Sequence, residues 1–470
     1  MELARLTTLL NGAILDGARL VGAGDGDGEV DVTGVAHDSR AVAPGDLFCC
    51  VRGEHADGHD HAAAAVGAGA VALLCERRLD LPIPQVVVPD ARAAMGPAAA
   101  AVHGNPSEHL VVIGVTGTNG KTTTVHLLSS ILEHAGRRAE VIGTLTGART
   151  TPEAPELQRR FADFLAAGVE AVAMEVSSHA LALHRVDGTR FRAAVFTNLS
   201  AEHLDFHATM EEYFQAKARL FTPELADAAV VNVDDPRGRL LRDAAIIPTR
   251  GFSLDEVDDL EVGHTSSRFR WRDQHVTVPL GGRFNVANAL AAAETAITLG
   301  IEPAVAAEGL ATAGPVPGRF EAVDAGQDFG VVVDYAHTPD GLERLLDTAR
   351  ELVGEGRLLL VFGCGGDRDT AKRPLMGEVA GRLADQVVLT SDNPRSEDPA
   401  TIISEVRSGF DDDRTLLVEP DRRRAIAMAL ETADPGDLVV IAGKGHETTQ
   451  TIGETTLPFD DRVVARELLS

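Results

Sequence analysis

Long apolar runs are absent from this chain of 470 residues. Charged residues or glycines interrupt each hydrophobic stretch well short of the roughly 20 residues that a membrane-spanning helix needs. The opening residues, Met-Glu-Leu-Ala-Arg, do not have the pattern of a secretory leader. We therefore expect a cytoplasmic protein with no stable membrane association.

Cysteine is scarce as well. The four cysteines are Cys49, Cys50, Cys75 and Cys364, and no pair of them has the spacing of metal ligands. Cys49 and Cys50 are adjacent within the apolar run 47–51. We predict that the cysteines are reduced residues that pack in the interior.

Positive charge is in deficit, because 43 lysines and arginines face 71 aspartates and glutamates, a formal net charge of −28. Such a surface repels a nucleic-acid backbone, so we expect no nucleic-acid partner. An anionic substrate would have to be met by local basic groups against an unfavourable overall field. The hydrophobic content of 44% is typical of a globular protein, and the length predicts several domains.

The most informative motif follows the apolar run 111–115. It reads Gly117-Thr118-Asn119-Gly120-Lys121-Thr122-Thr123 and leads into a helical pattern. Glycines let backbone N–H groups turn toward phosphate oxygens, and a helix N-terminus adds the positive end of its dipole. Lys121 then reaches the terminal phosphates, and the Thr122 hydroxyl can bind Mg²⁺. This strand–loop–helix predicts a nucleoside triphosphate site, but it leaves the use of the phosphate open.

Three units follow from the distribution of strands and breaks. Turn-forming residues at 103–107 and 314–318 divide the chain into 1–107, 108–314 and 315–470. Strand-like runs are expected at 34–36, 46–48, 70–74, 85–88, 171–176, 193–198, 330–334, 358–362, 386–390 and 438–442. Their alternation with helical stretches predicts an α/β fold with parallel sheets in the second and third units.

Polar residues near strand ends in the second unit are candidate ligands. Glu175 ends an apolar run beside the phosphate loop, so it is either a Mg²⁺ ligand or an ordinary solvated glutamate. His203 and His207 stand four residues apart, which suits either a metal pair on a helical face or a structural pair. Lys217 lies in a helix-like pattern and, taken alone, is predicted to be a surface lysine.

The third unit repeats this arrangement. Asp334 and His337 follow one predicted strand, and glycine-rich or polar turns at 363–369, 392–395 and 443–447 follow three others. An arginine fork can bind a carboxylate while acids bind an ammonium group, so these turns suit a zwitterion. A salt-bridged loop cluster without a ligand is the alternative.

Together these motifs resemble the Mur ligase family, the ATP-dependent amide-forming enzymes of peptidoglycan synthesis. The resemblance extends over essentially the whole chain. It rests on motifs at 117–123, 175–179, 197–207, 285–289, 334–339 and 443–447. It implies a central P-loop ATPase domain, an N-terminal nucleotide-sugar domain and a C-terminal Rossmann-like domain that binds an amino acid.

Two features narrow the resemblance. Residues 37–40 and 44–48 are similar to a uridine-site region, and Asp392-Asn393-Pro394-Arg395 is similar to the form associated with meso-2,6-diaminopimelate. The expected substrates are therefore UDP-N-acetylmuramoyl-L-alanyl-D-glutamate and meso-2,6-diaminopimelate, with ATP, two Mg²⁺ ions and a monomeric enzyme. The alternatives are a lysine-adding Mur ligase, a folylpolyglutamate-synthase-like ligase and a P-loop kinase.

The resemblance also implies residue roles. The residues implied to bind ATP are Gly117, Thr118, Asn119, Gly120, Lys121, Thr122, Thr123, Asn288, Arg319, Asp334 and His337. Those implied to bind metal are Thr122, Glu175, His203 and Lys217 as a carbamate; with Lys121, the last three are the implied catalytic residues. Those implied to contact the UDP-sugar are Ser39, Glu54, His55, Ala56, Thr150, Thr151, Ser177 and Arg185. Those implied to bind the amino acid are Arg368, Asp392, Asn393, Pro394, Arg395, Gly443 and Glu447.

Overall fold

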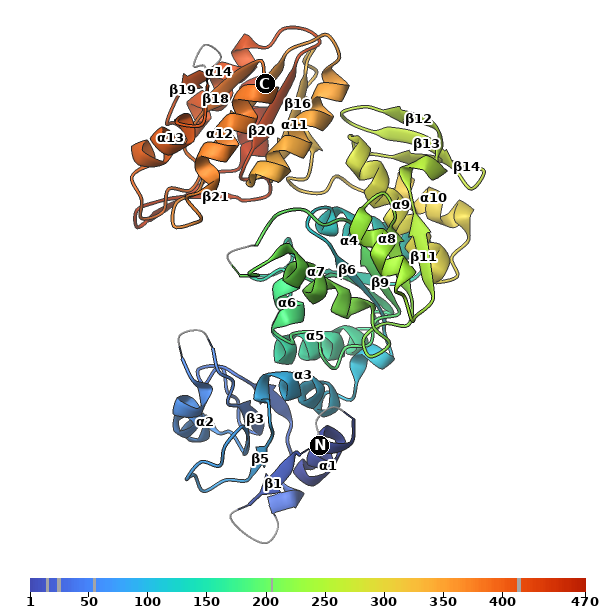
Figure 1. Cartoon of the computed structure of the whole chain (residues 1–470), viewed down its shortest axis with the longest axis vertical. Helices are drawn as coiled ribbons and strands as arrows, with labels where there is room; N and C mark the ends of the chain where they lie inside the picture. The colour runs from blue at the N-terminus through green and yellow to red at the C-terminus, as the bar shows by residue number, and fades with distance from the viewer. Residues whose placement is uncertain (14–16, 23–26, 54–55, 204–205, 412–415) are drawn as a thin grey trace.

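Three lobes follow one another in chain order in the computed structural model of the protein (Figure 1). The structure describes residues 1–13, 17–22, 27–53, 56–203, 206–411 and 416–470. Each lobe is built on its own sheet. Within these ranges no helix is long and apolar enough to cross a membrane.

The N-terminal lobe is a five-stranded sheet between helices. In spatial order its strands are β1 (Arg19–Val21), β5 (Gln85–Val87), β4 (Ala72–Cys75), β3 (Asp46–Cys49) and β2 (Gly34–Ala36), and only β1 runs antiparallel to its neighbour. Helices α1 (Leu3–Ala13) and α3 (Ala91–Val102) cover one face, and α2 (Ala62–Ala68) covers the other. Successive residues of β3 alternate between the two cores, as a strand buried on both faces requires. All four cysteines of the chain are buried free thiols, as predicted.

The central lobe contains a six-stranded parallel sheet. Its order is β11 (Thr249–Phe252), β10 (Ala229–Asn232), β9 (Ala193–Phe196), β6 (Val111–Thr116), β8 (Ala171–Glu175) and β7 (Ala139–Ile142). One face packs on α4 (Lys121–His134), α9 (Arg283–Thr298), α10 (Pro303–Ala311) and the small antiparallel sheet β12 (Asp258–Val262), β13 (Ser267–Trp271) and β14 (Gln274–Val278). The other face packs on α5 (Ala154–Ala166), α6 (Ser178–Ala182), α7 (Met210–Ala218) and α8 (Pro236–Asp243). The parallel sheet predicted from the apolar runs is confirmed.

The C-terminal lobe is a second open sheet. Its order is β15 (Glu321–Ala322), β16 (Gly330–Asp334), β20 (Leu438–Ala442), β17 (Leu358–Phe362), β18 (Gln386–Leu389) and β19 (Leu416–Val418), with only β15 antiparallel. The lobe's helices are α11 (Pro339–Val353), α12 (Lys372–Leu383), α13 (Pro399–Arg407), α14 (Arg422–Thr432) and α15 (Asp461–Leu469). A hairpin of β21 (Thr449–Ile452) and β22 (Thr455–Pro458) adds to the lobe near the carboxyl ends of its strands.

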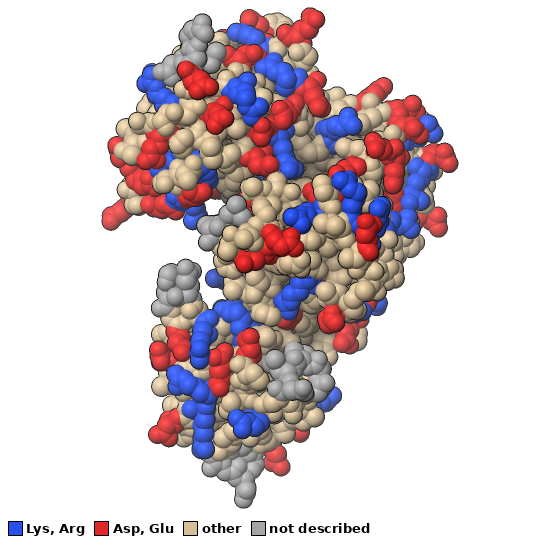
Figure 2. All heavy atoms as spheres, in the orientation of Figure 1, with Lys and Arg blue, Asp and Glu red and all other residues tan. Residues whose placement is uncertain are grey.

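The surface in view has an indentation between the N-terminal and C-terminal lobes, bordered by the central lobe (Figure 2). Acidic side chains predominate on the C-terminal lobe in this view and along the β12–β13 region, with basic side chains between them. The loops that carry the candidate ATP and amino-acid residues line common cavities between the central and C-terminal lobes, and in both sheets these loops follow the carboxyl ends of strands.

Candidate active site

The phosphate loop connects β6, which ends at Thr116, to α4, which begins at Lys121. Gly117 and Gly120 have φ angles of 149° and 85°, which other residues rarely adopt. A Cβ atom on Gly117 would collide with Thr197 Oγ1, and one on Gly120 would collide with Asn288 Oδ1. The loop therefore needs glycine at both positions, because it packs closely against Thr197 and Asn288.

The segment after β9 supports this loop. Thr118 N donates to Asn198 O at 2.9 Å, and Asn119 N donates to Asn198 Oδ1 at 3.0 Å. In return, Thr197 Oγ1 donates to Asn119 O at 2.6 Å. Part of the motif at 197–207 thus fixes the loop conformation.

A cavity of about 290 Å³ opens beside the loop. Lys121 Nζ donates to the carbonyl oxygens of Gly117 and Thr118 at 3.0 and 2.8 Å, which keeps the ammonium group at the mouth of the loop. The first N–H groups of α4 have no partner within the helix. The chemistry of this cradle fits a triphosphate, because backbone N–H groups, an ammonium group and a helix N-terminus converge on it. The candidates that line the cavity are Thr118, Asn119, Gly120, Lys121, Thr122, Thr123, Arg319, Asp334 and His337.

Two candidate ATP residues lie outside the lining. Gly117 contributes through its carbonyl oxygen, which also accepts a hydrogen bond from Lys217 Nζ at 2.8 Å. Asn288 is buried on α9 behind Gly120, where its Nδ2 donates to Asn285 Oδ1 at 3.1 Å. Asn288 therefore shapes the loop from behind rather than from inside the cavity.

The oxygen donors beside the loop suit a hard divalent cation. Thr122 Oγ1 lies 3.0 Å from Glu175 Oε1, and Glu175 is only 1% exposed at the end of β8. The same carboxylate oxygen accepts a hydrogen bond from Thr144 N at 2.8 Å, which fixes its orientation. Mg²⁺ prefers such oxygen ligands together with phosphate oxygens, so the donor set fits the implied ion. Within the described ranges, no group of three His, Cys, Asp or Glu side chains could hold a metal by itself.

Lys217 is buried, with 1% of its surface exposed, so its interpretation as a surface lysine is wrong. Thr209 is the N-cap of α7, where its side chain accepts a hydrogen bond from Glu212 N, and Lys217 lies in the last turn of the helix. The Lys217 Nζ atom lies 4.6 Å from the centre of the Tyr213 ring. Burial, with Lys121 nearby, lowers the pKa of Lys217 well below its usual value, which favours the neutral amine.

His203 and His207 do not share a helical face. His203 has a φ angle of 57°, which no α-helical residue adopts. His203 lines the cavity beside the phosphate loop, whereas His207 is buried and its Nε2 lies 3.0 Å from Ser178 Oγ. The helical metal pair is therefore excluded, although both imidazole rings pack against the rings of His179 and Tyr213.

The wall of the cavity opposite the loop comes from the C-terminal lobe. The Arg319 guanidinium lies 4.7 Å from the centre of the Tyr335 ring, and its Nη2 lies 3.3 Å from Thr122 Oγ1. Asp334 at the end of β16 accepts hydrogen bonds from Phe320 N and Ala336 N at 2.7 and 2.8 Å. His337 Nδ1 donates to Tyr335 O at 2.9 Å, and burial together with Lys372 lowers the pKa of His337 to about 4. A neutral imidazole therefore faces the cavity at physiological pH.

A second cavity of about 600 Å³ adjoins the first. The candidates that line it are Arg368, Asp392, Arg395, Gly443 and Glu447. Asn393 lies behind them and donates from Nδ2 to Glu447 Oε2 at 2.6 Å, while Pro394 shapes the turn against Gly366. Burial raises the pKa of Asp392, and the nearby Arg422 and Lys444 oppose that shift. Basic and acidic side chains thus meet around one space, as the zwitterion hypothesis requires.

The two cavities share part of their lining. The shared residues are Glu202, His203, Tyr335, His337 and Thr338. Glu202 and Tyr335 were not predicted, although both lie inside motifs that the sequence singled out. Their neighbours His203 and His337 were predicted as site residues because imidazoles are common ligands. The direction in which the side chain of a loop glutamate such as Glu202 points is decided only by folding.

A cluster next to the phosphate loop holds four of the UDP-sugar candidates, and one of them, Thr150, also lines the cavity beside the loop. Thr151 Oγ1 donates to Glu175 O at 2.9 Å and accepts from Ser177 N at 3.0 Å. Thr150 Oγ1 lies 3.0 Å from Thr144 Oγ1, and Arg185 Nη1 donates to Thr151 O at 3.4 Å. This cluster is therefore connected to the phosphate loop through Glu175.

The other UDP-sugar candidates belong to the N-terminal lobe. Ser39 is half-buried in the turn after β2, and Ala56 is exposed. Among the described residues, no hydrogen bond joins either of them to the Thr150–Arg185 cluster. Glu54 and His55 lie outside the described residues.

Known families match this chain over most of its length. Residues 31–109 match "Mur ligase family, catalytic domain", residues 115–296 match "Mur ligase middle domain", and residues 318–445 match "Mur ligase, glutamate ligase domain". With the phosphate loop and the two adjoining cavities, these matches establish that the chain belongs to the Mur ligase family.

Individual relatives are more specific. The UDP-N-acetylmuramoyl-L-alanyl-D-glutamate–2,6-diaminopimelate ligase of Syntrophomonas wolfei is 47% identical over 95% of this chain and 96% of its own. The enzyme of the same name from Streptomyces coelicolor is 47% identical over 94% of this chain and 93% of its own. A solved structure of a ligase of this name has a TM-score of 0.68 at 35% identity, covering 93% of this chain and 94% of that one. The MurF ligase of Thermotoga maritima in complex with ADP, with a TM-score of 0.62 at 21% identity over 93% of this chain and 96% of that one, shares the fold.

Proposed function

We propose that this chain is an ATP-dependent ligase that adds meso-2,6-diaminopimelate to UDP-N-acetylmuramoyl-L-alanyl-D-glutamate in the synthesis of peptidoglycan precursors. The observation that carries the proposal is the pair of adjoining cavities. One has the chemistry for a triphosphate and the other has the chemistry for a zwitterion, and they meet at Glu202, His203, Tyr335 and His337. Relatives at 47% identity that bear this enzyme's name support the choice of substrates.

The reaction proceeds in two steps. An oxygen of the free D-glutamate carboxylate attacks the γ-phosphorus of ATP, the bond to the β–γ bridging oxygen breaks, and ADP leaves. An amine of diaminopimelate then attacks the acyl carbon, and the tetrahedral intermediate expels phosphate and loses a proton to give the amide. A free carboxylate is a poor electrophile, so phosphorylation supplies the leaving group that amide formation needs. Catalysis of such transfers depends on positioning and on neutralising charge.

The phosphate loop and its neighbours meet the charge of the triphosphate. The residues proposed to bind ATP are those of the loop from Gly117 to Thr123 with Asn288, Arg319, Asp334 and His337. Thr122 and Glu175 would hold a first Mg²⁺, and His203 with Lys217 would serve a second. Bound there, Mg²⁺ would neutralise charge on the transferring phosphoryl group.

We propose that Lys217 acts as a carbamate. Its neutral amine adds to CO₂, a bond forms between Nζ and carbon, and the nitrogen releases one proton. The neutral amine thereby becomes an anionic, carboxylate-like metal ligand. The burial and lowered pKa of Lys217 support this step. Lys217→Ala should lose activity by at least about 100-fold, and a short carboxylic acid should restore part of it. Full activity of the variant, or a loss that short acids do not relieve, would reject the carbamate.

The zwitterion site divides by charge. Arg368 and Arg395 would bind a carboxylate of diaminopimelate, and Asp392 and Glu447 would bind an ammonium group. Asn393, Pro394 and Gly443 would shape the same pocket. The UDP-sugar would contact Thr150, Thr151, Ser177 and Arg185, with Ser39, Glu54, His55 and Ala56 from the N-terminal lobe.

The domain roles follow from these sites. We assign residues 1–107 to the UDP-sugar, 108–314 to ATP and 315–470 to the amino acid. The hydrogen bond from Ser200 Oγ to Asp340 Oδ2, 2.6 Å long, connects the last two where their cavities meet. Closure of these lobes would exclude water that otherwise hydrolyses the acyl phosphate.

A phosphate-release assay tests the proposal. The purified protein receives ATP, Mg²⁺ and the UDP-muramoyl dipeptide, and then either meso-diaminopimelate or L-lysine. Release should depend on diaminopimelate and be far slower with lysine. Equal rates with lysine would reject the proposed specificity, and release indifferent to any amino acid would reject the ligase reaction in favour of simple ATP hydrolysis.

A further inference from the structure

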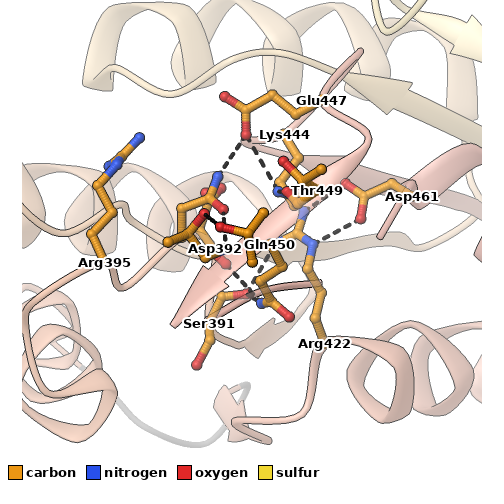
Figure 3. A network of polar contacts seen from close by, with 12 residues as sticks. Ser391, Asp392, Arg395, Arg422, Lys444, Glu447, Thr449, Gln450 and Asp461 are labelled. Carbon is orange, nitrogen blue, oxygen red and sulfur yellow. Dashed lines mark hydrogen bonds and ion pairs between the residues drawn. The ribbon is translucent and has the colours of Figure 1, made fainter. Parts of the chain in front are cut away.

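A buried ion pair lies behind the amino-acid cavity. Arg422, the first residue of α14, donates from Nε and Nη2 to the two carboxylate oxygens of Asp461, the first residue of α15, at 2.8 and 2.7 Å. Both side chains are fully buried, and neither is among the residues that line the cavity. In Figure 3 the pair lies on the side of Asp392 away from Arg395. Any effect of this pair on the cavity therefore passes through other residues.

The same guanidinium connects two segments that do line the cavity. Arg422 Nη2 donates to Ala442 O at 2.9 Å, and Nη1 approaches Ser391 O at 3.5 Å. Ala442 precedes Gly443, and Ser391 precedes Asp392. One planar group thus touches the backbone immediately before two of the candidate amino-acid ligands.

The spacing of these two segments is tight. Gly443 has a φ angle of 111°, and a Cβ atom there would lie 2.6 Å from Asp392 Oδ2. Gln450 Nε2 donates to Asp392 O at 2.7 Å, and Lys444 Nζ donates to Thr449 O at 2.6 Å (Figure 3). The carbonyl groups of Ser391, Asp392 and Ala442 all accept hydrogen bonds from buried side chains. A change in these side chains would therefore move the Ser391–Asp392 or the Ala442–Gly443 segment, and Asp392 or Gly443 would move with it.

Stability alone does not account for such a pair. Burying two charges costs desolvation energy that their attraction often only balances, and an apolar pair of similar volume is often as stable. What a bidentate arginine adds is a fixed geometry for every oxygen it contacts.

We propose that Arg422 and Asp461 are positioning residues, which set the separation of the Ser391–Asp392 and Ala442–Gly443 segments and thereby the affinity for the incoming amino acid. The inference rests on the proposed ligase function. It assigns the pair to binding of the amino acid and not to binding of ATP, because Asp392 and Gly443 line the amino-acid cavity and neither lines the cavity beside the phosphate loop.

Kinetics of variants of the full-length chain test this role. Arg422→Met should raise the KM for meso-diaminopimelate by about tenfold or more while the KM for ATP changes by less than about twofold, because small displacements of ligands are costly. The KM of Arg422→Lys for meso-diaminopimelate should lie between those of the wild type and Arg422→Met. An ammonium group cannot bind both oxygens of Asp461 and both carbonyl groups at once. A purely structural role would instead lower the fraction of active enzyme and leave the KM values unchanged.

The neighbouring residue provides a matched control. Arg423 pairs with Glu467 of α15 at 2.7 Å, but both side chains are about half exposed. Arg423→Met removes an arginine between the same two helices and should leave both KM values unchanged. If Arg422→Met does not fold, the double variant Arg422→Met with Asp461→Leu restores a matched apolar pair, and its KM for diaminopimelate should still be raised.

The outcomes separate the two proposals. A wild-type protein without diaminopimelate-dependent phosphate release overturns the proposed function and this inference with it. An active wild type together with a folded Arg422 variant, single or double, whose KM for diaminopimelate is normal overturns the inference alone. An equal rise in the KM for ATP and for diaminopimelate also overturns it, because the pair would then affect the lobe as a whole.

Discussion

His337 shows how a single residue is tuned by its surroundings. His337 lines both cavities, and its Nδ1 donates a hydrogen bond to Tyr335 O. Its own carbonyl oxygen accepts a hydrogen bond from Lys372 Nζ at 2.8 Å. Burial first, and then the nearby lysine charge, lower its pKa to about 4. The side chain therefore offers a neutral ring to an anionic ligand and takes no proton from it near neutral pH.

The lowered pKa of His337 predicts that the free energy of unfolding depends on pH. An unfolded histidine has a pKa of about 6.5, so between about pH 6.5 and 4 the unfolded chain binds a proton that the folded chain does not. Folding stability should fall as the pH drops through this window. His337→Gln keeps a donor but does not titrate, so the wild type should lose about 2 kcal/mol relative to the variant between pH 7 and 4.5. Urea unfolding at each pH measures this, and parallel stability curves would contradict it.

At the residue scale, sequence predicted some positions and missed others. Lys121, Thr122 and Glu175 line one cavity, as the sequence led us to expect, because a contiguous loop and a strand end determine where they lie. Lys217 looked exposed because its helix is short and mixed in polarity, and only packing against the phosphate loop buries it. Glu202 was missed because the direction of a loop side chain depends on contacts between lobes.

At the element scale, α12 is attached to the turn that carries Arg395. Arg373 on α12 has no exposed side-chain surface; it binds Glu397 through two hydrogen bonds of 2.9 Å and Glu405 through one of 2.6 Å. Glu397 in turn accepts from Asp367 N, and Arg395 Nη1 donates to Gly366 O at 2.6 Å. The helix thus holds together the two turns that present Arg368 and Arg395.

Replacing Arg373 should separate this helix from its turns. Arg373→Met should lower the free energy of unfolding by about 2 kcal/mol, because it removes a buried cation from two carboxylates that water reaches only in part. Arg382→Met on the same helix removes an exposed pair with Glu343 and should change stability by less than about 0.5 kcal/mol. Denaturant unfolding of both variants compares the two, and equal losses would show that burial of Arg373 has no special effect.

The elements differ in how well sequence predicts them. The buried strands β6, β8, β16 and β17 were predicted because parallel strands covered on both faces are continuous apolar runs. The β12–β14 sheet and the β21–β22 hairpin were not predicted. β12 and β22 are largely exposed and contain no apolar run, whereas β13 and β14 alternate buried and exposed residues, a pattern of period two that a search for continuous apolar runs overlooks.

At the scale of the whole molecule, the net charge of the protein has the same sign as the charge of its proposed substrates. The chain has a formal charge of −28, and the proposed substrates ATP and the UDP-sugar are both anions. The basic groups at the site, such as Lys121, Arg185 and Arg319, act only at short range. Long-range repulsion should therefore slow the approach of substrate.

Salt should reduce this repulsion. Raising monovalent salt from about 10 mM to 150 mM shortens the screening length from roughly 30 Å to 8 Å. The kcat/KM for the UDP-muramoyl dipeptide should rise severalfold over this range, since contacts inside the cavity are screened less than the outer field. Stopped-flow or steady-state rates at constant Mg²⁺ measure it, with a neutral osmolyte as the control for general solvent effects. A steady fall with salt would show that the local basic groups dominate at long range as well.

The contact between Arg422 and Asp461 also has a consequence for the order of synthesis. Asp461 opens α15, which follows every strand of its sheet along the chain. A ribosome therefore completes all the cavity-lining loops of the C-terminal lobe before it makes the residue that fixes two of them. Until α15 docks, Arg422 would be a buried cation without its carboxylate. A nascent or proteolysed chain that lacks the residues from 461 onward should therefore retain the nucleotide site but bind the amino acid poorly.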